Sequence, residues 1–152
     1  MGYMIVVVGW WMIEVWIDGL CEPVMPAHAR TACFGYVIKR NGKVVDEGSG
    51  VIGEGQKMTN NVAEYTALIR ALEQVRSPGL DEKVVVHSDS RLVVNQMKGE
   101  WKVKAPNIMH LYSKAVALAK DKDVVFEWVP REENTRADSL ARTAYEARRR
   151  RR

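Results

Sequence analysis

Four acidic residues far apart in the chain, Asp18, Glu64, Asp89 and Asp138, each stand where a strand or helix is expected to begin or end. Strand ends and helix starts of an α/β sheet meet at one edge, so we expect the four carboxylates to converge there. Carboxylates that close repel one another strongly, and a cation must compensate. Oxygen ligands without a supporting histidine or cysteine suit Mg²⁺ or Mn²⁺, which take further ligands from a substrate phosphate.

Two divalent ions about 4 Å apart would fit such a set of carboxylates. One ion would prepare a water molecule for in-line attack on phosphorus, and the other would stabilise the leaving 3′ oxygen without a protein acid. The chemistry expected from the four residues is therefore hydrolysis of a phosphodiester bond.

Each of the four positions also has an ordinary structural explanation. Asp18 precedes a glycine, as turn residues often do, and Glu64 follows an asparagine by three residues, as in a helix capping box. Asp89 could cap the next helix, and Asp138 stands four residues before Arg142, the spacing of an exposed ion pair. The functional interpretation depends on the convergence of all four.

Hydrophobic periodicity indicates the elements that would position these residues. Residues 13–17 alternate between apolar and polar, which predicts a strand that closes at Asp18-Gly19, and Asn41-Gly42 predicts a hairpin. The other expected elements are strands at 32–39 and from 43 towards 52, a helix through 65–75 that ends near Ser77-Pro78-Gly79, a strand at 83–87, helices at 90–97 and 106–120, a strand at 124–129 and a helix at 134–150. This order predicts an α/β domain with a five-stranded mixed sheet, its first three strands antiparallel, and helices on both faces.

The chain has 152 residues, 47% of them hydrophobic, which suits one globular domain. We divide it into an apolar N-terminal extension at 1–11, a domain at 12–147 and a basic C-terminal tail at 148–152. The net charge is +4, but Arg148 to Arg152 carry five positive charges, so the remainder sums to −1. Such a tail is either a solvated end or a segment that binds phosphate.

The apolar stretch near the start of the chain is shorter than the roughly 20 residues that cross a bilayer, and it lacks the features of a secretory signal. It could form an added strand or a dimer contact, or reflect a start codon assigned too early. Cys21 and Cys33 show neither metal-ligand pairing nor the density of a disulfide scaffold, which indicates a reducing, cytoplasmic setting. We expect a monomer that binds no membrane.

The sequence around the four acidic residues resembles the type 1 ribonucleases H, from Met12 to about Ala147. The motifs that carry the resemblance are Ile17-Asp18-Gly19, Thr59 to Glu64, Ser88-Asp89-Ser90 and Asn134 to Arg142. The compact archaeal-type members are the most similar, through Asp18 to Pro23, Gly99 to Lys104 and Trp128 to Asn134. The resemblance implies a ribonuclease H-like fold and an endonuclease that cuts the RNA strand of RNA/DNA hybrids with two Mg²⁺ ions, Mn²⁺ being possible, to leave 5′-phosphate and 3′-hydroxyl ends.

By the same resemblance, Asp18, Glu64, Asp89 and Asp138 are the catalytic residues that bind metal. The substrate-binding residues that it implies are Gly19, Thr59, Asn60, Asn61, Ser90, Trp101, Lys102, Lys104 and Arg131. Polar groups can reach the 2′-hydroxyls in the wide minor groove of a hybrid, and an aromatic residue beside lysines suits sugar and phosphate. The structural alternatives are helix capping for the residues before Glu64, a core cover for Trp101 and a solvated loop side chain for Arg131.

The chain departs from the family pattern in three places. No histidine lies between Pro130 and Arg136, where many bacterial members have one, and Val24 to Ala29 replace a glycine-rich turn. The basic protrusion of some members is absent. Two rival functions stay open: a nucleic-acid-binding module that has lost hydrolysis, against which the four intact carboxylates argue, and a nuclease of the same fold that acts on DNA, against which the Thr59-Asn60-Asn61 turn argues.

Overall fold

The computed structural model describes residues 12–75 and 82–151. The expectations for residues 1–11, for a helix end at 77–79 and for Arg152 lie outside this range. In chain order the elements are β1 (Met12–Glu22), η1 (Ala27–Ala29), β2 (Thr31–Arg40), β3 (Lys43–Glu54), α2 (Asn60–Gln74), β4 (Lys83–Ser88), α3 (Arg91–Met97), α4 (Pro106–Ala119), β5 (Asp123–Trp128), η2 (Arg131–Glu133) and α5 (Thr135–Arg150). In the range described, no helix combines the length and the apolar character that a membrane crossing needs.

The five strands form one sheet in the order β3-β2-β1-β4-β5. β1 to β3 are antiparallel to their neighbours, whereas β4 runs parallel to β1 and β5 parallel to β4. Asn41 and Gly42 join β2 to β3 with φ angles of 52° and 82°, the positive values that a tight two-residue hairpin requires. The predicted five-stranded mixed sheet with three antiparallel strands first is therefore confirmed.

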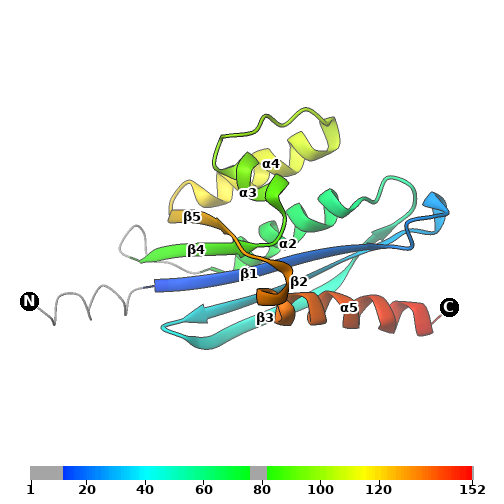
Figure 1. Ribbon diagram of the computed structural model, residues 1–152, viewed down its shortest axis with the longest axis horizontal. Helices are drawn as coiled ribbons and strands as arrows, with labels where there is room; N and C mark the ends of the chain where they lie inside the picture. Colours follow the sequence, from blue (N-terminus) through cyan, green and yellow to red (C-terminus); the bar gives the residue numbers. More distant parts are fainter. Residues whose placement is uncertain (1–11, 76–81, 152) are drawn as a thin grey trace, which may run out of the picture.

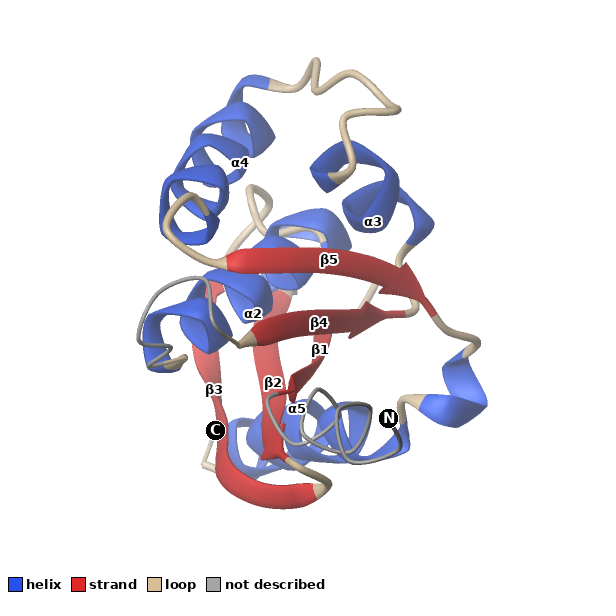
Figure 2. Ribbon diagram, turned by 90° about the vertical axis from the view of Figure 1, so that its left-hand side faces the viewer, coloured by secondary structure: helices blue, strands red, loops and turns tan. Residues whose placement is uncertain are grey.

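Helices cover both faces of the sheet, as predicted (Figures 1 and 2). On one face α2 packs against β1 and β2, and α4 packs on α2. On the other face α5 packs against β1, β2 and β3. The main core lies between the sheet and α2, where Ile13, Val15 and Ile17 meet Leu68 and Leu72. The alternation in the first strand thus separates a face that packs on α2 from a face that carries Glu14, Trp16 and Asp18.

The first strand does not end at Asp18-Gly19, so the prediction of a turn there is wrong. β1 continues to Glu22, and Asp18 pairs with Gly35 of β2. A Cβ atom on Gly19 would lie 2.3 Å from the carbonyl carbon of Ala63, so this glycine serves the close approach of α2. Gly35 does the same for α5, because its Cβ would lie 2.3 Å from the carbonyl oxygen of Ala137. The two helices thus reach the sheet from opposite faces beside Asp18.

The ordinary explanations for the other three acidic residues do not hold either. Thr59 is the N-cap of α2 and accepts a hydrogen bond from the Val62 amide at 3.1 Å, so Glu64 lies beyond the first turn. Ser90, not Asp89, caps α3. Arg142 pairs with Glu22 at 2.8 Å and not with Asp138. The three carboxylates are therefore left for another role.

The basic C-terminal stretch continues α5 up to Arg150. Arg148 pairs with Glu54 at the end of β3, and Arg149 pairs with Glu146 one turn earlier at 2.8 Å. Part of this stretch is thus an exposed helical turn with ion pairs, and not a separate irregular end.

Candidate active site

Three of the four acidic residues converge from three separate elements. Asp18 lies within β1, Glu64 in the second turn of α2, and Asp89 directly after β4. Each offers a carboxylate oxygen, and these oxygens all lie within 4.8 Å of one another. Asp18 and Glu64 are buried, with 6% and 7% of their surfaces exposed, whereas Asp89 is partly exposed.

Burial and mutual repulsion dominate the electrostatics of this cluster. Burial, and then the charge of Asp89, raise the pKa of Asp18 from 3.8 to about 8. Burial and the charge of Asp18 also raise the pKa of Glu64 well above its usual value, although a hydrogen bond from the Gly19 amide opposes this. Burial raises the pKa of Asp89 as well, against the opposing effects of Asn134 and Arg131. In the absence of a cation the cluster therefore retains protons that ordinary carboxyl groups lose.

Asp138 lies beside this cluster in the first turn of α5. It contributes a side-chain hydrogen bond and a negative charge that raise the pKa of Asp18, and its charge also raises the pKa of Asp89. The close contact of α5 with Gly35, the strand partner of Asp18, accounts for this position. The structure thus brings the fourth predicted residue next to Asp18 and Asp89.

Asn134 fastens α5 to the site, a role that was not expected from the sequence. Its side chain is buried, with 1% of the residue exposed, and Nδ2 donates to the carbonyl of Ile17 at 2.7 Å. Its side chain also hydrogen-bonds Asp89 and thereby lowers the pKa of that carboxyl. Asn134 therefore connects β1, Asp89 and the start of the helix that carries Asp138. The one signal in the sequence was its position four residues before Asp138.

The cluster opens into a cavity of about 390 Å³. The residues that line it are Asp18, Gly19, Asn60, Glu64, Asp89, Trp128 and Arg131. Arg131 is exposed, and its charge lowers the pKa of Asp89, so this predicted cation does lie beside the carboxylates. Trp128 was not expected here. Its Nε1 donates to the carbonyl of Asp89 at 3.1 Å, and the Arg91 guanidinium lies 3.8 Å from the ring centroid.

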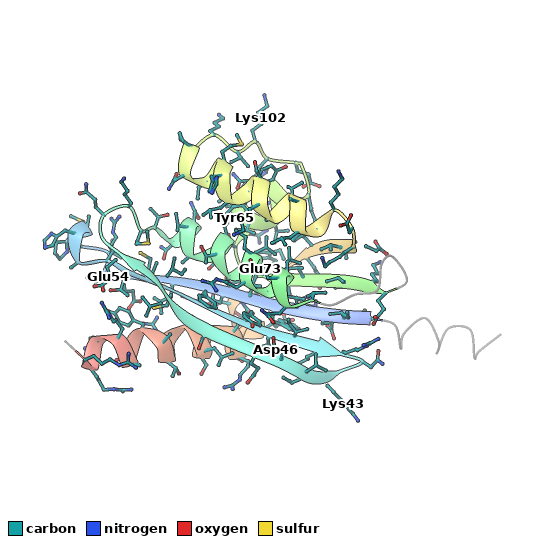
Figure 3. The ribbon with its side chains drawn as sticks, turned by 180° about the vertical axis from the view of Figure 1, so that it is seen from behind. Lys43, Asp46, Glu54, Tyr65, Glu73 and Lys102 are labelled. Carbon is teal, nitrogen blue, oxygen red and sulfur yellow. The ribbon has the colours of Figure 1, made fainter. Side chains whose placement is uncertain are left out.

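The other predicted substrate-binding residues lie at three places. Thr59 and Asn61 line a second cavity of about 340 Å³, together with Asn60. Ser90 caps α3 through its Oγ. Trp101 and Lys102 line a third cavity of about 300 Å³, and Lys104 is exposed on the same segment before α4. Figure 3 shows Lys102 pointing outward from that segment. The structure therefore does not bring this basic segment into the carboxylate cavity.

The donor set fits a hard divalent cation. The converging atoms are carboxylate oxygens, the ligands that such ions prefer. Oε2 of Glu64 is buried and has no hydrogen-bond partner in the described part of the chain, although Oε1 accepts from the Gly19 amide at 3.0 Å. A buried carboxylate oxygen without a partner is costly unless a cation satisfies it. Asp18, Glu64 and Asp89 would hold the ion, with Asp138 beside them.

Comparison with known proteins identifies one family model and several similar proteins. A family model described as reverse transcriptase-like matches residues 25–144. A bifunctional protein of Mycobacterium tuberculosis is 47% identical over 105 residues, which is 68% of this chain and 28% of the relative, so the chain spans little more than a quarter of that protein. A ribonuclease H of Geotalea uraniireducens is 31% identical over 149 residues, 88% of this chain and 94% of the relative.

Solved structures agree with these relatives. The N-terminal RNase H domain of the mycobacterial protein has 38% identity and a TM-score of 0.78, over 90% of this chain and 94% of that one. LC11-RNase H1, a protein isolated from compost and solved in complex with an RNA/DNA hybrid, has 35% identity and a TM-score of 0.76. That match covers 89% of this chain and 97% of the other.

Proposed function

The chain belongs to the ribonuclease H family, and from this premise we propose that it is an endonuclease that hydrolyses the RNA strand of RNA/DNA hybrids, leaving 5′-phosphate and 3′-hydroxyl ends. The observation that carries the proposal is the convergence of Asp18, Glu64 and Asp89 within 4.8 Å, with Asp138 beside them. Such a cluster has no structural use that would offset its repulsion. The structure in complex with a hybrid, that of LC11-RNase H1, supports the choice of substrate.

We propose Mg²⁺ as the cofactor, with two ions in each site and Mn²⁺ as a possible substitute. When bound, the ions would activate water and stabilise the charge that develops on the phosphate. Asp18, Glu64, Asp89 and Asp138 would bind them. Arg131, the cation in the wall of the cavity, would attract the phosphate backbone to the carboxylates.

The choice of RNA over DNA would depend on polar groups beside the carboxylates. Asn60 lines the carboxylate cavity, and Thr59 and Asn61 line the one next to it. Amides of this kind can hydrogen-bond a 2′-hydroxyl, which only the RNA strand has, in the shallow minor groove of a hybrid. Ser90 and Gly19, which lines the carboxylate cavity, are further candidates, and Trp101, Lys102 and Lys104 would hold the substrate at a distance from the cut.

The domain division is also a proposal. We assign 1–11 as an apolar N-terminal extension, 12–147 as the ribonuclease H domain that carries out catalysis, and 148–152 as a basic C-terminal tail. Cys21 and Cys33 are both free, which suits a protein that acts as a monomer in the reducing cytoplasm.

The test is incubation of the purified protein with end-labelled RNA/DNA hybrid, duplex DNA and duplex RNA, each with Mg²⁺ and with chelator. We expect cleavage of the RNA strand of the hybrid, only with Mg²⁺, and 3′-hydroxyl ends that a polymerase can extend. Cleavage of duplex DNA alone would assign the chain to a different nuclease. Tight binding of the hybrid without any cleavage would support the rival interpretation of a binding module.

A further inference from the structure

We infer that Arg30 binds a backbone phosphate of the cleaved strand, beside the phosphate that is cut. This rests on the proposed function and adds a substrate-binding residue to it. Arg30 lines the second cavity, the one of about 340 Å³ that also contains Thr59 and Asn61. Asn60 lines both this cavity and the carboxylate cavity, so the two adjoin. A strand with one phosphate at the carboxylates can therefore continue past Asn60 to Arg30.

The guanidinium of Arg30 is held in place by carbonyl oxygens. Its Nε donates to the carbonyl of Val24 at 3.1 Å, and Nη1 donates to the carbonyl of Met58 at 3.4 Å. The backbone is fixed as well, because the amide of Gly55 donates to the carbonyl of Arg30 at 2.9 Å. Carbonyl oxygens orient a guanidinium without neutralising its charge. No bond from Nη2 is found within the described range, so a donor of the fork stays available for a ligand.

The carboxylates at the neighbouring strand ends are engaged elsewhere. Glu22 ends β1 and pairs with Arg142 at 2.8 Å, and Glu54 ends β3 and pairs with Arg148. Within the described residues, Arg30 itself has no salt bridge. Two arginines of α5 thus compensate the acidic groups on this side of the molecule, and the charge of Arg30 remains for an external anion.

The lining of the cavity suits a sugar-phosphate strand. A planar guanidinium binds a phosphate through two parallel hydrogen bonds, and the amides of Asn60 and Asn61 can bond sugar hydroxyls. Val24, which also lines the cavity, is apolar and 69% exposed, so it can pack against a sugar ring. The first turn of α2 contains no acidic residue that would repel a phosphate.

The test compares Arg30→Gln with Lys43→Gln, which removes one exposed charge at the opposite end of β3 from Glu54 (Figure 3). We expect Arg30→Gln to lower kcat/KM on a labelled hybrid about tenfold, through KM, and Lys43→Gln to lower it less than about twofold. Arg30→Lys keeps the positive charge but lacks the planar guanidinium, so its kcat/KM should lie between those of the other two variants. Thermal melting establishes that each variant is folded.

A phosphate scan locates the contact. In a series of hybrids, one nucleotide of the RNA strand is replaced by a deoxynucleotide with an uncharged methylphosphonate linkage, and the matched control carries the same deoxynucleotide with a normal phosphate. At one position beside the cut, the neutral linkage should lower kcat/KM of the native protein about tenfold. The same linkage should leave kcat/KM of Arg30→Gln unchanged. Equal effects in both proteins at every position, or equal effects of Arg30→Gln and Lys43→Gln, would overturn the inference.

The two proposals fail in different ways. If the native protein cleaves no hybrid, the proposed function fails, and fluorescence anisotropy with chelator still measures whether Arg30→Gln weakens binding of the hybrid more than Lys43→Gln does. If the native protein cleaves the hybrid and the two variants bind it equally, only the role of Arg30 is wrong.

Discussion

The amide of Gly19 donates a hydrogen bond to Oε1 of Glu64 at 3.0 Å, which joins the strand that carries Asp18 to the helix that carries the second carboxylate. The bond forms because Gly19 lacks a side chain and α2 can come against the strand. One oxygen of Glu64 is thereby oriented, and the other is left unsatisfied beside Asp18 and Asp89.

Gly19→Ala should destabilise the fold and displace Glu64. The added methyl group would lie 2.3 Å from backbone atoms of Ala63 and Glu64, which cannot move independently of α2. We expect a loss of about 3 kcal/mol in the free energy of unfolding and a large loss of cleavage. The control is Gly53→Ala, whose new methyl group would meet only the flexible side chain of Met58, at 3.3 Å. Denaturant unfolding measures the free energy of unfolding of both variants, and equal values would contradict the prediction.

Asp18→Asn should abolish cleavage and make the protein more stable in chelator. The substitution removes a buried carboxyl whose pKa is raised to about 8 by burial and by Asp89, and so relieves repulsion in the cluster. We expect a melting temperature roughly 5 °C higher than that of the native protein in chelator. Asp138→Asn should also abolish cleavage while the protein stays folded. Full activity of either variant would remove that residue from the proposed site.

The stability gained from Mg²⁺ should increase with pH. A folded-state pKa above the unfolded value means that the folded protein holds the proton more tightly, so this contribution is lost as pH rises from about 4 to about 8. Mg²⁺ binds the deprotonated cluster and restores the loss. Melting curves should therefore show a larger rise with Mg²⁺ at about pH 9 than at about pH 5. Asp18→Asn should reduce this difference, and an equal rise at both pH values would count against a metal site here.

Asn134→Ala should weaken metal binding as well as the fold. The change removes the 2.7 Å bond to the Ile17 carbonyl and the hydrogen bond to Asp89, and leaves a buried acceptor unsatisfied. We expect a loss of about 2 kcal/mol in stability and a tenfold or greater loss of Mg²⁺ affinity, about the range for groups that orient ligands. Gln96→Ala is the control, because this buried amide bonds the Tyr65 hydroxyl and the Lys102 carbonyl away from the carboxylates. Calorimetric titration with Mg²⁺ should separate the two variants.

Much of the fold could be predicted because it depends on local patterns. Alternating residues specify the start of β1, Asn41-Gly42 specifies the hairpin, and apolar residues at helical spacing specify α2. Most observed helix and strand bounds lie within a residue or two of the expected ones, because the periodicity of apolar residues can be read from the sequence alone. The four acidic residues could be singled out for a different reason, their motifs, and their catalytic role stays a prediction.

The contributions of Gly19, Asn134 and Arg30 could not be predicted, because each depends on a partner far along the chain. A glycine after an aspartate looks the same whether it permits a turn or the approach of a helix whose contact is 45 residues away. Asn134 bonds a carbonyl 117 residues away, and nothing in its neighbourhood indicates that it is buried. The proposed role of Arg30 depends on the cavity that it lines. Residues from two distant parts of the chain form this cavity.

The contact between Gly35 and α5 has a consequence for biosynthesis. Asp138 reaches Asp18 and Asp89 only after α5 has docked on the sheet, and α5 is synthesised after the strands and helices that carry the other three carboxylates. On the proposed function, a nascent or C-terminally cut chain would hold three of the four ligands and leave hybrids intact. Docking of α5 on the sheet would then serve as the step that switches the nuclease on.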